Sequence, residues 1–197
     1  MSEQETSDVG ARVLEMRTQR GLSLRALAEL CELSPNTISL IERGATSPSV
    51  STLQRLASAF GVHINAFFVD PEHKAQLILT RSDQRTRSGS ASVMLESLGY
   101  GLEGQACDPF VVTLKPGASS GRQLMAHQGS EMIFVFAGQL DIEVSGVRYL
   151  LHPGDCLLFR GEQPHRWRNP NSQPAEFLMM MQATQDRDVS LEQHLHP

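Results

Sequence analysis

The sequence is poor in cysteine, and no Cys-x-x-Cys pair occurs in it. A disulfide framework and a zinc finger are therefore not indicated, and the reducing cytoplasm is the natural compartment. No apolar run approaches the roughly 18–20 residues of a membrane span, because Arg12, Glu15 and Arg17 interrupt the first one. We therefore predict neither a signal peptide nor a membrane segment. The three cysteines are Cys31, Cys107 and Cys156.

The chain also lacks an excess of positive charge, since 17 lysines and arginines face 22 aspartates and glutamates, for a formal net charge of −5. This balance is a caution against nucleic-acid binding, because phosphate contacts need Lys or Arg clustered on one surface. Residues 9–62 nevertheless carry a local excess of arginine over glutamate, which weakly favours DNA binding by that part. The arginines are Arg12, Arg17, Arg20, Arg25, Arg43 and Arg55, and the glutamates are Glu15, Glu29, Glu32 and Glu42.

The composition is that of a folded protein, with 40% hydrophobic and 20% charged residues. A chain of 197 residues can form one large domain or two small ones. The first third predicts short helices, because apolar residues recur there at helical spacing. We expect helix starts at Ser23, Ser34 and near Ser51, and a brief last helix at 64–68.

The remainder of the chain predicts strands. Residues 70–92 are polar and are interpreted as a linker, with a first strand at 76–80. Beyond them, apolar segments of strand length are separated by turn signals such as Pro116-Gly117 and Pro153-Gly154. Residues 140–145 alternate apolar and polar side chains, which is the period of a half-buried strand. Short strands at this spacing indicate an antiparallel sandwich or barrel.

Two short helices, a tight turn at Glu32-Leu33 and a polar-faced third helix follow the plan of a helix-turn-helix. Residues 12–62 resemble the phage-repressor-like (Xre/Cro) family. The matching segments are Gly21-Leu22-Ser23, Leu27-Ala28, Ser34-Pro35-Asn36-Thr37-Ile38-Ser39, Ile41-Glu42-Arg43-Gly44 and Pro48-Ser49. Glu32 departs from the family, which usually has a left-handed glycine there, at a cost of roughly 1 kcal/mol.

The resemblance implies a DNA-binding domain at 8–69 whose recognition helix begins near Pro35. Ile38 and Ile41 would face the bundle. The alternative is a helical bundle without a DNA function. The residues expected at DNA are Ser23, Arg25, Ser34, Asn36, Thr37, Ser39 and Arg43.

The stretch 116–169 resembles the two cupin motifs, G-x5-H-x-H-x3,4-E-x6-G and G-x5-P-x-G-x2-H-x3-N. His127, Glu131 and Gly138 fit the first motif, while Met125 stands where its first histidine would be. The second motif is fitted by Gly154, His165 and Asn169, with Arg160 and Glu162 in place of its proline and glycine. The expected fold is therefore α+β with two domains, an all-α helix-turn-helix bundle and an all-β cupin (jelly-roll) barrel at 93–184, followed by a polar tail at 185–197.

Three candidate metal ligands remain in the barrel, namely His127, Glu131 and His165. Two imidazoles and one carboxylate can hold a divalent ion such as Fe, Zn, Ni or Mn as a facial triad with open positions. Met125, Trp167 and Asn169 are expected to line the pocket around it. The alternative is a metal-free pocket in which the histidines are merely hydrogen-bonded.

Almost the whole chain, from about Arg12 to Gln182, is similar to regulators that join an Xre-type domain to a single cupin. This resemblance implies a cytoplasmic homodimer on a palindromic operator, with a small-molecule effector in the barrel. The rival is the mononuclear iron enzyme that epoxidises 2-hydroxypropylphosphonate, because His127-x3-Glu131 with a distant His165 resembles its iron triad. We prefer the regulator, since the polar recognition helix and Arg43 are intact and no convincing match exists for the enzyme's further substrate-binding residues.

Overall fold

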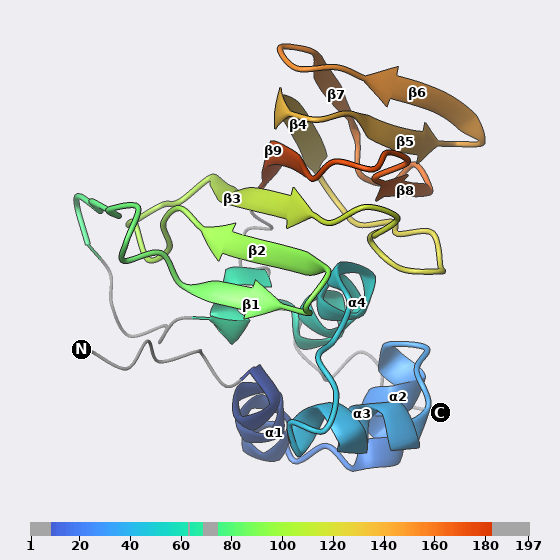
Figure 1. Cartoon of the computed structure of the whole chain (residues 1–197). Coiled ribbons are helices and arrows are strands. Elements are labelled where there is room, and N and C mark those ends of the chain that lie inside the picture. Colours follow the sequence, from blue (N-terminus) through green and yellow to red (C-terminus); the bar gives the residue numbers. More distant parts are fainter. Residues whose placement is uncertain (1–8, 63, 69–74, 183–197) are drawn as a thin grey trace.

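The structure is a computed structural model that describes residues 9–62, 64–68 and 75–182. Helices form the first part and strands the second (Figure 1). The helices are α1 (Val9–Gln19), α2 (Leu24–Leu30), α3 (Pro35–Glu42), α4 (Val50–Phe60) and the short 3-10 helix η1 (Ile64–Phe67). The strands are β1 (Arg87–Gly89), β2 (Val93–Ser97), β3 (Cys107–Leu114), β4 (Ser130–Ala137), β5 (Leu140–Val144), β6 (Val147–Leu151), β7 (Cys156–Arg160), β8 (His165–Arg168) and β9 (Ala175–Gln182).

Serine caps set the starts of α2, α3 and α4. The hydroxyls of Ser23 and Ser34 accept hydrogen bonds from backbone N–H groups three residues on, as predicted. The fourth helix is capped by Ser49 and not by Ser51, so its predicted start was wrong by two residues. Ser51 instead lies buried against the barrel, where its N–H donates to the Ser120 carbonyl at 3.4 Å.

The turn between α2 and α3 has the left-handed conformation that the family comparison predicted. Glu32 has φ 50° although it is not glycine. The turn is braced by the Leu33 N–H, which donates to the Ala28 carbonyl at 2.9 Å.

A shielded ion pair joins α1 to α3, because the Arg17 Nε and the Glu42 Oε1 lie 2.6 Å apart. The hydrogen bond to Glu42 raises the pKa of Arg17, so this guanidinium stays charged.

Two antiparallel sheets form the barrel, in the orders β1-β2-β3-β9-β4-β7 and β6-β5-β8. The predicted antiparallel sandwich is confirmed, but the predicted strand at 76–80 is wrong: the structure has only an isolated bridge there, between Ala75 and Leu102. The first strand is β1, inside the predicted linker. Gly89 permits its turn, since a Cβ at φ 140° would lie 2.1 Å from the Val93 carbonyl oxygen. The end of the predicted linker therefore forms the β1–β2 hairpin, whose turn is braced by Ser90.

The helical part packs directly on the six-stranded sheet, with α4 and η1 against β3 and β9 (Figure 1). The Asn65 amide donates to the Asp108 carboxylate at 3.0 Å, and the rings of Phe68 and Phe110 meet edge to face at 6.2 Å. One continuous cluster of buried apolar side chains runs through both domains. A change inside the barrel can therefore reach α4 through packed contacts.

Candidate functional site

The inward faces of β4 and β8 bring the three candidate metal ligands together. Because side chains alternate along a strand, Glu131 points inward with Ile133 and Val135, and all three are fully buried. His165 likewise points inward from β8 and is fully buried. His127 lies in the connection before β4. The strand pleat therefore directs both Glu131 and His165 into the barrel interior.

The three side chains form a compact cluster around one carboxylate oxygen. The His127 Nε2 lies 2.9 Å and the His165 Nε2 3.3 Å from the Glu131 Oε2. The three candidate ligand atoms all lie within 4.8 Å of one another. Ligands held about 2.1 Å from one ion at angles of 90–109° lie about 3.0–3.4 Å apart. The two nitrogen–oxygen separations therefore agree with a shared ion.

Backbone carbonyls fix both imidazole rings from the opposite side. The Nδ1 of His127 lies 3.1 Å from the Gln128 carbonyl oxygen, and the Nδ1 of His165 lies 2.7 Å from that of Gln163. A carbonyl can only accept, so each Nδ1 carries hydrogen and the Nε2 lone pairs of neutral rings face the carboxylate. With both rings neutral, three acceptors would face one another; a bound cation, or a proton on one ring that then donates to Glu131, resolves this conflict.

The electrostatics of the cluster follow from its burial and its internal hydrogen bonds. Burial lowers the pKa of His127, but the hydrogen bond to Glu131 and the carboxylate charge outweigh it, so the pKa is raised. Burial raises the pKa of Glu131, but the hydrogen bonds with His127 and His165 outweigh it, so this pKa is lowered. The carboxylate therefore stays ionised in an enclosed site. A buried anion of this kind attracts a cation.

Gly161 is a site residue that the sequence analysis missed. A Cβ at this position would lie 2.5 Å from the Cε1 and 2.6 Å from the Nδ1 of His127. The imidazole of His127 can occupy its place only because residue 161 has no side chain. The sequence did offer a signal: the second cupin motif has a glycine at the position of Glu162, and in this chain a glycine stands one position earlier, at 161.

The predicted pocket residues have different environments. Met125 is opposite His165 in a bridge with reciprocal backbone hydrogen bonds of 2.7 and 2.8 Å, so the two side chains share a face. Met125 is 3% exposed and therefore lies beside the cluster. Trp167 is fully buried with its ring 5.3 Å from that of Phe177. Asn169 braces a turn, because its amide donates to the Leu114 and Gln173 carbonyls.

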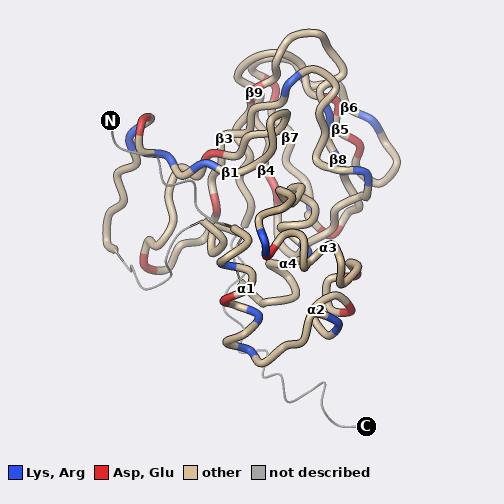
Figure 2. Tube along the Cα trace, turned by 60° about the horizontal axis from the view of Figure 1, so that its bottom comes forward, with Lys and Arg blue, Asp and Glu red and all other residues tan. Residues whose placement is uncertain are grey.

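The residues expected at DNA lie along the outer side of α2 and α3. Arg25, Asn36 and Arg43 are exposed, and Thr37 and Ser39 are partly exposed. The predicted inward positions Ile38 and Ile41 are buried. Figure 2 shows acidic and basic positions interspersed on α1 and α2, so this surface has no uniformly basic face. The predicted serines at 23 and 34 are exposed at the two helix N-termini, where their hydroxyls cap the helices.

Comparison with known proteins agrees with both halves of this architecture. The helix-turn-helix family matches residues 13–67, and the cupin domain family matches residues 110–181. The HTH-type transcriptional regulator PuuR of Escherichia coli is 31% identical over 164 residues, which cover 83% of this chain and 88% of PuuR. The chain belongs to the HTH-type transcriptional regulators that carry a cupin domain. It is therefore a DNA-binding transcriptional regulator with a cupin domain.

Solved structures support the same assignment. An HTH_3 family transcriptional regulator from Vibrio cholerae matches with a TM-score of 0.70 and 25% identity, over 92% of this chain and 97% of that one. Hydroxypropylphosphonic acid epoxidase from S. wedmorenis, the rival, matches with a TM-score of 0.49 and 19% identity, over 91% of this chain and all of the enzyme chain. A likeness at this level carries no argument about activity. Within the described residues, no helix is long and apolar enough to cross a bilayer.

Proposed function

We propose that this regulator is a homodimer that binds a palindromic operator, and that a divalent transition ion at His127, Glu131 and His165 sets its affinity for DNA together with a small effector. The observation that supports the metal is the buried cluster in which both imidazole Nε2 atoms converge on one Glu131 oxygen while both Nδ1 atoms face backbone carbonyls. Backbone acceptors on the outer imidazole nitrogens are the usual support of metal-bound histidines.

The donor set suits Fe, Zn, Ni or Mn, because two imidazoles and one carboxylate leave coordination positions open. When bound, the ion supplies a Lewis-acidic position that an oxygen or nitrogen atom of an effector can occupy. Met125 stands where a fourth protein ligand would be, so this coordination position stays open for the effector. The ring of Phe159 packs on the ring of His165, with 4.9 Å between the two ring centres. Trp167 contributes to the apolar interior beside β8. Asn169 stays outside the proposed pocket, since its amide is engaged in a turn.

At the DNA, α3 enters the major groove with Asn36, Thr37 and Ser39, while Arg25 and Arg43 contact phosphates. The capping serines, Ser23 and Ser34, present the N-termini of α2 and α3 to the DNA backbone. A two-fold dimer reads half-sites about one helical turn apart. The effector then acts by changing how the two recognition helices are placed.

A buried contact between the domains offers a route for this change. The Gln54 Nε2 on α4 donates to the Met181 Sδ at 3.0 Å. Met181 is directly opposite Glu131 in the pairing of β4 with β9, so the two side chains are neighbours on one face. A shift of Glu131 toward an ion therefore alters the surroundings of Met181 and, through Gln54, of α4. Helix α4 follows the recognition helix directly.

Metal analysis of protein purified without chelator tests the metal. We expect close to one equivalent per chain in the wild type and less than about a tenth in Glu131→Ala. Glu143→Ala is the matched control, because Glu143 lies on the outer face of β5 and should leave the metal content unchanged. A wild-type content below a tenth, with no recovery on adding Fe, Zn, Ni or Mn, would contradict the metal and favour a metal-free pocket.

A further inference from the structure

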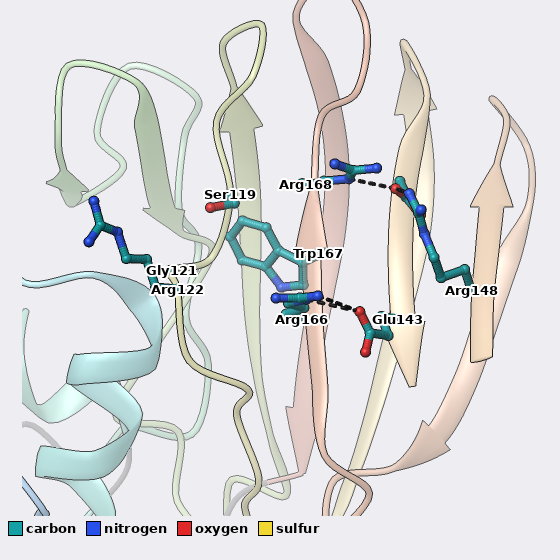
Figure 3. Close-up of a pocket in the computed structure, with 9 residues that line it drawn as sticks. Ser119, Gly121, Arg122, Glu143, Arg148, Arg166, Trp167 and Arg168 are labelled. Carbon is teal, nitrogen blue, oxygen red and sulfur yellow. Dashed lines mark hydrogen bonds and ion pairs between the residues drawn. The ribbon is translucent and has the colours of Figure 1, made fainter. Parts of the chain in front are cut away.

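The outer face of the small sheet carries a charged groove that the metal site does not use (Figure 3). Its volume is about 380 Å³, within the range of small-ligand sites. Arg122 stands at one end, Arg148 at the other, and Arg166 and Arg168 between them. Two carboxylates, Asp141 and Glu143, complete its charges, so the groove has a formal charge of +2 in a chain of −5.

The two carboxylates hold three of the guanidinium groups in place. Asp141, whose side chain is 7% exposed, accepts from Arg148 and from the Arg168 Nε at 2.6 Å. Glu143 accepts from the Arg166 Nε and Nη2 at 3.0 and 2.7 Å. Arg168 donates only through Nε to the described residues, which leaves its two Nη groups available. Ion pairing alone therefore does not account for this many arginines.

Arg122 contributes the least engaged guanidinium of the groove. It is exposed, and within the described part of the chain its side chain makes no hydrogen bond or ion pair. A guanidinium has five N–H donors in a planar fork, and carboxylate and phosphate oxygens match this geometry. The groove thus offers surplus donors and surplus positive charge in a concave site of limited volume.

We propose that this groove binds a small organic anion that carries at least two negative charges as carboxylate or phosphate groups. One anionic group lies between Arg166 and Arg168, and the other reaches Arg122. The pre-positioned guanidinium groups lower the entropy lost on binding. This site is separate from the metal cluster, because the exposed side chains of Arg166 and Arg168 lie on the opposite face of β8 from the buried His165.

The groove also borders the DNA-binding domain. Ser119 bridges to Arg168, and the Ser120 N–H donates to the Trp167 carbonyl at 2.9 Å, so this segment is paired with β8. The next residue, Gly121, lies against α4, since a Cβ there would lie 2.6 Å from the Ser51 Oγ. An anion that joins Arg122 to β8 therefore tightens the segment on which the start of α4 rests.

Calorimetric titration with citrate tests the proposal, using full-length protein stripped of metal and then dialysed free of chelator, at constant ionic strength. We expect binding with Kd below about 1 mM and at least a fivefold loss in Arg122→Gln. The matched control is Arg81→Gln, an exposed arginine outside the groove, which should bind citrate like the wild type. Inorganic phosphate, which is too short to span the groove, should bind at least tenfold more weakly than citrate.

Two results would overturn the proposal. The first is citrate binding that is equal in the wild type and Arg122→Gln, or no binding at 10 mM. The second combines two observations: the wild type does not bind citrate, and the slope of log DNA affinity against log salt falls by about 0.9 in Arg122→Gln. That combination would make the groove a contact for DNA phosphates. Neither result depends on the metal, so a failure here leaves the proposed function standing.

Discussion

Replacing Gln54 by leucine should stabilise the protein although it removes a hydrogen bond. The Gln54 side chain is buried between α4 and the barrel, and its Oε1 has no hydrogen-bond partner among the described residues. A buried polar atom without a partner costs about 1–3 kcal/mol. Its one bond, to the Met181 sulfur, uses a weak acceptor and contributes about 0.5–1 kcal/mol. Leucine has a similar volume and no polar atom.

The difference gives a net stabilisation of about 1 kcal/mol. For a chain of this size, that corresponds to a rise in melting temperature of about 2–4 °C. Thermal unfolding of the metal-free protein, followed by circular dichroism, measures the shift. Ser58→Ala serves as the control, because Ser58 is an exposed position on the same helix and should leave the melting temperature within 1 °C.

The same variant should lose the response to metal at the DNA. If Gln54 carries the signal from Met181 to α4, the metal-free affinity for the operator stays within twofold of the wild type. The metal-dependent change, typically 5–150-fold for such couplings, falls below twofold. A drop in melting temperature of 2 °C or more would refute the stability argument, and an intact metal response would refute the route through Gln54.

Three further outcomes follow from the structure. Gly161→Ala should weaken metal affinity at least tenfold in a zinc titration, because its Cβ would meet the His127 ring. Gly99→Ala should not, because its Cβ would make only an ordinary van der Waals contact, at 3.5 Å from the Ile78 side chain. Burial raises the pKa of Asp141, but the hydrogen bonds from Arg148 and Arg168 outweigh the burial, so the pKa is lowered. The ionised Asp141 therefore contributes its full stabilisation above the ordinary pKa of aspartate, and this stabilisation is lost as the pH falls through the lowered pKa. In urea unfolding between pH 2 and 6, the free energy of unfolding should fall less steeply with decreasing pH in Asp141→Asn than in the wild type. Arg43→Ala should weaken operator binding and reduce its salt slope by about 0.9, while Arg81→Ala should not.

Much of the fold could be predicted because local patterns and global packing agree. The serine caps and the inward alternation of β4 and β8 follow from the residue pattern, whereas the left-handed Glu32 followed from the family resemblance. The cluster of His127, Glu131 and His165 was predicted as a set from motif spacing, and the structure adds only its geometry.

The errors have local physical causes. The serines at 49 and 51 are equally good caps in sequence, and only the contact of Ser51 with the barrel distinguishes them. Residues 76–80 have apolar side chains at strand spacing but no neighbouring strand, while β1 is polar because it lies at the sheet edge. Gln54 gave no signal, since a polar residue in an amphipathic helix is expected to face solvent. Its role depends on which surface the barrel covers.

The central claim is that the metal cluster controls DNA binding, and it is tested by titrating the protein onto DNA selected from a random library, with and without zinc. We predict a palindromic selected site and an affinity that changes at least fivefold with zinc in the wild type. In His165→Ala, the affinity should be independent of zinc and within twofold of the metal-free wild type. A wild-type affinity that does not change with zinc, iron, nickel or manganese, although the metal is bound, would contradict the account.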